Sequence, residues 1–241
     1  MTVAESAALI LSVFVASTTQ VTVGFGFALL GVPLMALTLP TREAVVVSTV
    51  LGLFTSSFQA WHGRRDVERA LVVRMVGSAL VGLPLGWFLF TRVDEDVLRI
   101  LLGVSVMVAV LLLASKRVAT GSRRLDVTCG VLSGALAASL STNGPPLVFA
   151  LQARGLPMSV FRPTINTVFT VSGILALSGF IISDDVSGDA LIHSLTAIPV
   201  LVIGSRSGFI LRGRVSETGA RQLALFLLAL AGLAAILSAV W

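Results

Sequence analysis

Apolar runs of about the length that spans a bilayer recur from one end of this 241-residue chain to the other. A transmembrane helix needs about 20 consecutive, predominantly apolar residues. Charged residues make up only 12% of the chain, against about 25% in a typical soluble domain. No polar stretch is long enough to fold separately. The sequence therefore predicts an all-α polytopic membrane protein with one domain, residues 1–241, multi-pass in the cell inner membrane or plasma membrane of a prokaryote.

The apolar runs fall into two similar sets. The first half contains runs at residues 4–21, 25–39, 44–61, 70–90 and 97–115, and the second half contains runs at 127–140, 147–153, 163–182, 191–211 and 217–240. Similar residues recur at an offset of 118 and, further along, of 122: Gly26 and Gly144, Ser48-Thr49 and Asn166-Thr167, Gly86 and Gly208, Val93 and Val215, Arg99 and Arg221. These correspondences predict two repeats of about 120 residues, 4–115 and 126–241, as is common in transporters.

Loop charge indicates how the repeats are oriented. Cytoplasmic loops carry an excess of Lys and Arg, so the basic loops 62–69 and 116–126 belong inside and 91–96 belongs outside. In the second half the acidic loop 183–189 belongs outside and the basic loop 212–221 inside, which reverses the order. The pattern therefore predicts inverted repeats, each with a broken or re-entrant helix pair followed by three transmembrane helices.

The first two runs of each half are interrupted by Gly and Pro. Residues 22–33 read TVGFGFALLGVP and residues 139–146 read SLSTNGPP. A helix break at membrane depth survives only where it is buried in protein or lines a polar cavity, and matched breaks are a pointer to a transporter's binding site. Tight turns between ordinary spans are the alternative. Each broken pair is expected to form either a re-entrant hairpin or two full crossings.

Two segments of the first half resemble the TauE/SafE family of anion exporters: residues 24–50, GFGFALLGVPLMALTLPTREAVVVSTV, and residues 77–86, GSALVGLPLG. The resemblance extends over nearly the whole chain. Where the family has a run of consecutive glycines, this chain has GFG and TNGPP. The resemblance implies a secondary transporter that exports sulfite, an organosulfonate or a related organic acid, with coupling to protons. Alternating access between inverted repeats, driven by protons or by the membrane potential, is the expected mechanism.

The residues at the breaks suit anion binding independently of that resemblance. A helix N-terminus carries partial positive charge and free N–H groups, glycine lets a ligand approach the backbone, and Pro145 suits the first turn of a helix. The predicted substrate-binding residues are Gly24, Gly26, Ser48, Thr49, Ser141, Thr142, Asn143, Gly144, Pro145, Asn166 and Thr167. A second tier comprises Gln20, Gln59 and Arg206. For hydroxyl side chains the alternative is a backbone hydrogen bond within the helix, and for Arg206 it is snorkelling to the interface.

Other functions fit the sequence less well. A membrane-embedded enzyme needs a Ser/His or His/Glu cluster or paired Asp residues within the spans, but the chain has two His, both near span ends. We therefore expect no enzyme activity, no cofactor and no metal site. The net charge of +5 lies in short loops, which suits membrane orientation rather than nucleic-acid binding. The expected partners are a small anionic substrate and the lipid bilayer. A passive anion channel, a membrane subunit of a larger complex and a homodimer are left open.

Overall fold

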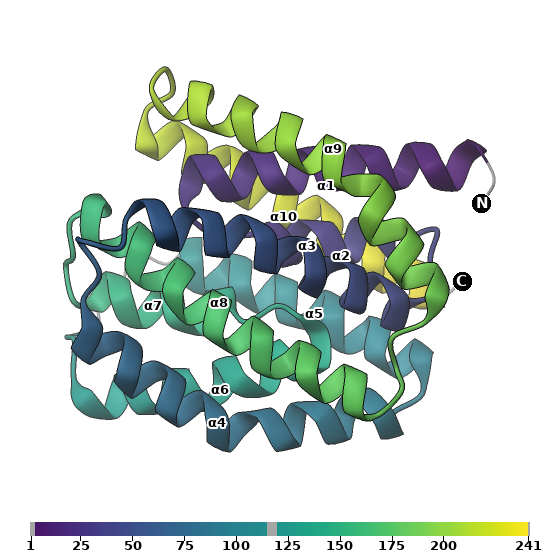
Figure 1. Ribbon diagram of the computed structural model, residues 1–241, viewed down its shortest axis with the longest axis horizontal. Helices are drawn as coiled ribbons and strands as arrows, with labels where there is room; N and C mark the ends of the chain where they lie inside the picture. The colour runs from purple at the N-terminus through teal and green to yellow at the C-terminus, as the bar shows by residue number, and fades with distance from the viewer. Residues whose placement is uncertain (1–2, 115–119, 241) are drawn as a thin grey trace.

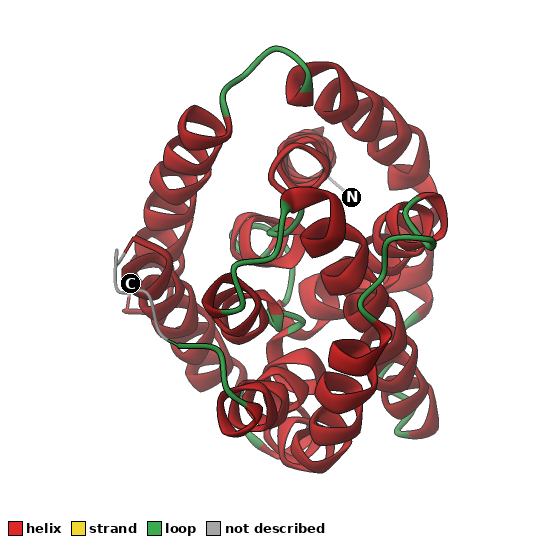
Figure 2. Ribbon diagram, turned by 90° about the vertical axis from the view of Figure 1, so that its left-hand side faces the viewer, coloured by secondary structure: helices red, strands yellow, loops and turns green. Residues whose placement is uncertain are grey.

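The computed structural model describes residues 3–114 and 120–240, which form ten α-helices and no strand (Figures 1 and 2). In chain order these are α1 (Val3–Val23), α2 (Phe27–Met35), α3 (Thr41–His62), α4 (Arg69–Arg92), α5 (Glu95–Ala114), α6 (Arg123–Leu140), α7 (Gly144–Ala153), α8 (Met158–Ile182), α9 (Gly188–Arg212) and α10 (Glu217–Val240). Part of the predicted basic loop 116–126, its residues 116–119, lies outside the described residues, as does the predicted end of the fifth run at 115. The all-helical prediction is confirmed.

Six of these helices are long and apolar enough to cross a membrane. They are α1, α3, α4, α5, α8 and α9, and α10 adds a shorter apolar stretch, Gln222–Leu237. Large apolar side chains are exposed along their outer faces, as expected where lipid replaces water. The chain is therefore a multi-pass membrane protein.

Each interrupted pair forms a helical hairpin. In the first, hairpin 1 (α1 and α2), Gly31 lies beside Ala16, and the Phe27 N–H donates to Gln20 Oε1 at 3.1 Å. In the second, hairpin 2 (α6 and α7), the Gly121 N–H just before α6 donates to the Ala153 carbonyl at 3.0 Å. The short helices α2 and α7 therefore double back toward the start of the helix before them. They have 9 and 10 residues, fewer than a full crossing needs, which favours the re-entrant alternative.

Hairpin 2 lies along α4 with unusually close backbone contact. A Cβ added at Gly82 would come 1.9 Å from the Val131 carbonyl oxygen, and one at Gly86 would come 2.1 Å from the Ala135 carbonyl oxygen. Only glycine permits this approach, and small residues are the common means by which membrane helices associate.

Hairpin 1 lies along α9 in the same way. A Cβ at Gly204 would meet Ser17 Oγ at 2.1 Å, and one at Gly208 would meet the Thr18 carbonyl oxygen at 2.7 Å. Gly204 and Gly208 stand 122 residues after Gly82 and Gly86 of α4. Each hairpin is thus packed on a long helix of the other half of the chain.

Two of the five pairs of corresponding helices, α5 with α10 and α3 with α8, pack on each other and run antiparallel. Gly103 of α5 lies against Ile236 of α10, whereas Val106, one turn later, lies against Gly232, one turn earlier. The pair α3 and α8 also runs antiparallel. The inverted relation of the repeats stays a prediction, and these directions are the ones it requires.

Several predicted boundaries are wrong by a few residues. The helix predicted to begin at residue 127 begins at Arg123, inside the predicted loop 116–126, and the start of α8 differs too. The sequence reading treats residues 154–162 as a connector and begins the next helix at Pro163, but α8 begins at Met158. Pro157, with φ −63° and ψ 149°, is the last extended residue of the connector, and the helix begins directly after it. Pro163 is therefore inside the helix, and Arg162 becomes a buried helical residue.

Candidate functional site

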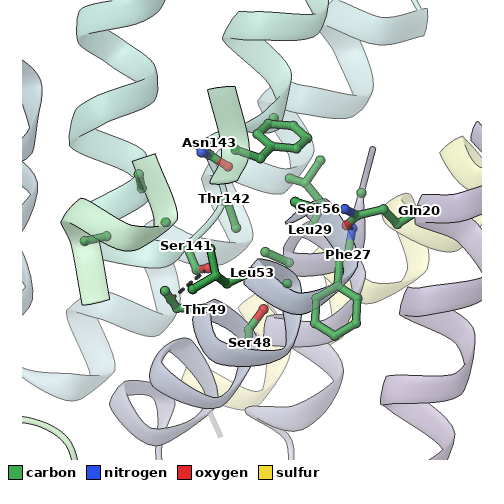
Figure 3. Close-up of a pocket in the computed structure, with 18 residues that line it drawn as sticks. Gln20, Phe27, Leu29, Ser48, Thr49, Leu53, Ser56, Ser141, Thr142 and Asn143 are labelled. Carbon is green, nitrogen blue, oxygen red and sulfur yellow. Dashed lines mark hydrogen bonds between the residues drawn. The ribbon is translucent and has the colours of Figure 1, made fainter. Parts of the chain in front are cut away.

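A cavity of about 50 Å³ lies where the two hairpins meet α3 and α8 (Figure 3). On α3 its lining extends from Ser48 to Ser56, which is the middle part of a helix that spans Thr41–His62. The cavity is therefore near the middle of a helix that is long and apolar enough to cross a membrane. It includes many of the predicted residues: Gln20, Gly26, Ser48, Thr49, Ser141, Thr142, Asn143 and Gly144.

Two hydroxyl groups of the lining have no hydrogen-bond partner among the described residues. Ser48 is fully buried and Thr142 is 1% exposed, yet neither Ser48 Oγ nor Thr142 Oγ1 is paired. A buried polar group without a partner costs about 1–3 kcal/mol, and most buried polar groups are satisfied. These two hydroxyls, one from α3 and one from hairpin 2, are therefore available to a ligand.

Thr49 and Ser141 add a third polar position at the same wall (Figure 3). Thr49 Oγ1 donates its proton to the Val45 carbonyl oxygen at 2.8 Å and lies within hydrogen-bond distance of Ser141 Oγ, 3.0 Å away. Ser141 has φ +58°, the left-handed conformation that ends α6. The Ser141 hydroxyl has one proton, which it can donate to Thr49 Oγ1 or turn toward a ligand in the cavity.

The N-termini of two helices also reach the cavity. α2 begins at Phe27 after Gly26, which has φ +109°, and α7 begins at Gly144 after Asn143. A helix N-terminus carries about half a positive charge. Pro145 lies in the first turn of α7, as its sequence position predicts. The lining contains no charged side chain, so the electrostatic preference at this point comes from helix ends and hydroxyls and favours an anion.

The chain matches the model of one known protein family. The model of the family described as "Sulfite exporter TauE/SafE" matches residues 9–235. The chain belongs to the TauE/SafE family. The resemblance inferred from the sequence is thereby confirmed, and with it the chain's membership of a family of membrane transporters rather than enzymes. Comparison with curated proteins and with solved structures finds no significant match.

Behind the cavity of this TauE/SafE protein lies a network of buried amides around Asn166. Its Nδ2 donates to the Gly24 carbonyl at 3.1 Å and to the Arg162 carbonyl at 2.8 Å. Its Oδ1 accepts from Gln20 Nε2 at 3.2 Å and from Gln59 Nε2 at 3.3 Å. Asn166 thus makes its hydrogen bonds within the protein and lies outside the lining, where it holds the turn of hairpin 1.

Arg162, a buried residue that holds the turn of hairpin 1 outside the cavity lining, is not among the predicted residues. It is 9% exposed, and its Nη2 donates to the Thr22 carbonyl at 3.1 Å. Its side chain covers Gly24, where an added Cβ would lie 2.9 Å from Arg162 Cγ. The sequence does contain a signal, since Arg162 stands four residues before Asn166 and therefore on the same helical face.

The remaining predicted residues lie outside the cavity lining. Thr167 donates its hydroxyl to the Pro163 carbonyl at 2.7 Å, which is the helix-internal bond named above as the alternative. Pro145 is buried in the first turn of α7. Arg206 lies in a separate groove on the outer surface of the helix bundle. Among the residues the structure describes, no group of three or more His, Cys, Asp or Glu is placed to hold a metal ion.

Proposed function

We propose that this TauE/SafE protein is a secondary transporter that binds a small oxyanion between the turns of its two hairpins and exports it. The observation that carries the proposal is the pair of buried, unpartnered hydroxyls, Ser48 Oγ and Thr142 Oγ1, beside two helix N-termini. An anion bound there accepts hydrogen bonds from both hydroxyls, which ends their cost of burial. We propose that the protein resides in the inner membrane or plasma membrane of a prokaryote.

The proposed substrate is sulfite, an organosulfonate or a related organic acid. Sites for drug-sized ligands measure about 300–1,000 Å³, whereas this cavity measures about 50 Å³. This volume favours the most compact member of the series, which is sulfite. The family's description as a sulfite exporter points the same way.

Alternating access between two inverted repeats is the proposed mechanism. Two features of the packing support it. Each hairpin packs on a helix of the other repeat, α1 on α9 and α6 on α4, and the pairs α5–α10 and α3–α8 run antiparallel. In such an arrangement one hairpin enters from each side of the membrane. Rocking one set of helices against the other then exposes the same central cavity first to one side and afterwards to the other.

Protons or the membrane potential are proposed to drive transport, and His193 with Glu43 is the proposed proton carrier. His193 of α9 is 7% exposed, and its Nδ1 is in contact with Glu43 Oε1 of α3. Glu43 lies five residues before Ser48 on α3, about 8 Å along the helix. A change in protonation here alters a contact between α3 and α9 close to the cavity.

The test is transport by purified protein in liposomes. Labelled sulfite is added under an imposed pH gradient, and we expect it to accumulate above its equilibrium concentration. The double variant Ser48→Ala/Thr142→Val is expected to lose accumulation. Ser133→Ala, which removes a buried unpartnered hydroxyl of α6 outside the cavity lining, is the matched control and is expected to transport normally. Equilibration without accumulation indicates a passive channel instead, and no flux of any anion contradicts the proposal.

The proton carrier is tested in the same liposomes. His193→Gln keeps a polar side chain but cannot carry a proton near neutral pH, so pH-driven accumulation is expected to disappear while exchange of internal for external anion continues. Unchanged accumulation in His193→Gln excludes His193 as the carrier. Loss of both activities in a folded protein assigns His193 a structural role instead.

A further inference from the structure

A second hollow lies on the outside of the bundle, between α1, α3 and α9, which pack side by side (Figure 1). Its volume is about 780 Å³, within the range of about 300–1,000 Å³ that is usual for small-molecule sites. Its walls include Phe54 and Phe58 of α3 and Phe209 and Ile210 of α9, which are 40–57% exposed. We call this hollow the outer groove. α3 separates it from the central cavity.

Arg206 is the one charged residue in the lining of the outer groove. It is exposed and makes no hydrogen bond or ion pair with any other residue in the described part of the chain. A guanidinium group surrounded by phenyl and aliphatic side chains in a membrane needs an anion or water to satisfy it. An occupant of the groove should therefore carry both apolar chains and a negative charge.

The depth of Arg206 matches the level of lipid headgroups. α9 has 25 residues and so is about 37 Å long, somewhat more than the hydrocarbon core of about 30 Å. Arg206 precedes the end of α9 at Arg212 by six residues, about 9 Å along the axis. An arginine side chain at that depth extends toward the interface and places its guanidinium at the phosphate level.

The groove ends at the basic face of the protein. α3 and α9 run parallel, since Glu43 contacts His193 near their starts and Phe58 packs edge-on against Phe209, 6.1 Å between centroids, near their ends. Both helices therefore end on the same side, where the loops 62–69 and 212–221 carry the basic residues. By the loop-charge rule this side is cytoplasmic, and the cytoplasmic leaflet is rich in anionic lipid.

We propose that the outer groove binds an anionic phospholipid of the cytoplasmic leaflet. Its phosphate pairs with Arg206, and an acyl chain lies along Phe54, Phe58 and Ile210. Basic pockets between helices on the cytoplasmic side are a recognised form of lipid site. The proposal does not rest on anion transport, because the groove and the cavity are separate and share no lining residue.

Native mass spectrometry of the purified protein tests the proposal. The protein is titrated with phosphatidylglycerol and, separately, with phosphatidylcholine of the same acyl chains. We expect one phosphatidylglycerol molecule to be retained in preference to phosphatidylcholine, and Arg206→Gln to weaken that retention about fivefold, the worth of one basic residue near a membrane surface. Arg212→Gln is the matched control. It removes the same charge from the same helix outside the groove lining and is expected to change retention less than twofold.

Three results overturn the proposal. Equal retention of the two lipids means that the groove binds acyl chains without recognising the charge of the headgroup. Equal retention of phosphatidylglycerol by the wild type and by Arg206→Gln means that the phosphate binds elsewhere. Efficient disulfide cross-linking of two copies through Ser205→Cys, a residue of the groove lining, means that a second copy of the chain occupies this face.

Discussion

The turns of the two hairpins differ in how they are held, although both interrupt membrane helices in corresponding places. The turn of hairpin 1, residues 24–26 (turn 1), is bound by Arg162 and Asn166, and the first N–H of the helix that follows is taken by Gln20. In the turn of hairpin 2, residues 141–143 (turn 2), Thr142 Oγ1 is unpaired. The difference supports the proposal that turn 1 is a fixed wall of the site and that turn 2 supplies groups to the ligand.

Backbone conformation shows the same contrast. Turn 1 has glycines at φ +106° and +109°, and turn 2 has a serine at φ +58°. Values near +57° are the left-handed region that a non-glycine residue occupies at moderate cost, while those beyond +100° are left to glycine. Turn 2 therefore has a hydroxyl side chain, that of Ser141, at its residue with positive φ, whereas the positive-φ residues of turn 1 are glycines without side chains.

The largest loss of stability is expected from Asn166→Ala. This change leaves the Gln59 Nε2 and the Gly24 carbonyl without their partner and removes one of the two partners of Gln20 Nε2, which keeps Ser56. At about 1–3 kcal/mol for each unsatisfied group, we expect about 3 kcal/mol, or a fall in Tm of about 6–12 °C. Thermal unfolding in detergent measures this. Thr167→Val, one position along, removes only a helix-internal bond and should change Tm little. Equal Tm values for the two variants contradict the anchoring of turn 1.

A smaller loss is expected from alanine at the two glycines of turn 1. Both substitutions force a side chain into a conformation that costs about 1–3 kcal/mol. Gly24→Ala should cost more than Gly26→Ala, because its Cβ would lie 2.9 Å from Arg162 Cγ, while the nearest atom at Gly26 is Thr19 Cγ2 at 3.9 Å. Comparison of their unfolding midpoints isolates the Arg162 contact. Equal destabilisation would show that Arg162 yields freely and does not fix turn 1.

The smallest change in stability is expected at turn 2. Thr142→Val replaces an unpartnered buried hydroxyl with a methyl group of similar size, which is nearly neutral or stabilising. We expect the free energy of unfolding to stay within about 1 kcal/mol of the wild-type value, while anion transport falls. Marked destabilisation of the ligand-free protein would mean that Thr142 has a structural partner, and that the contrast between the turns is wrong.

Much of this architecture follows from local sequence. Apolar runs mark the helices because every backbone group in lipid must be bonded within its own segment, and the breaks at Gly24–Gly26 and Asn143–Pro146 mark both hairpin turns. The glycines of α4 and α9 can be matched by their spacing, but that they fit against α6 and α1 depends on packing between distant segments. The directions of the paired helices likewise emerge only in three dimensions.

The sequence indicates which polar residues lie near the cavity better than it indicates which groups each of them contacts. Ser48 and Thr142 line the cavity as expected. Asn166 has the polarity that a binding residue needs, yet its hydrogen bonds go to groups from α1, α3 and the turn of hairpin 1 that meet only in the folded chain. The sequence places Arg162 in a connector that ends before Pro163, whereas its burial follows from the earlier start of α8 at Met158.

Binding of anions to the double variant Ser48→Ala/Thr142→Val tests the central claim most directly. Isothermal titration of wild-type protein with sulfite, methanesulfonate, sulfate and short carboxylates identifies the anion that it binds best. Hydrogen bonds to a charged group are worth about 1.5–3 kcal/mol each, so loss of both hydroxyls should weaken that anion's Kd about 100-fold or more. Ser133→Ala should bind as the wild type does. A double variant that binds within twofold of wild type, or a wild type that binds no anion, would contradict the account.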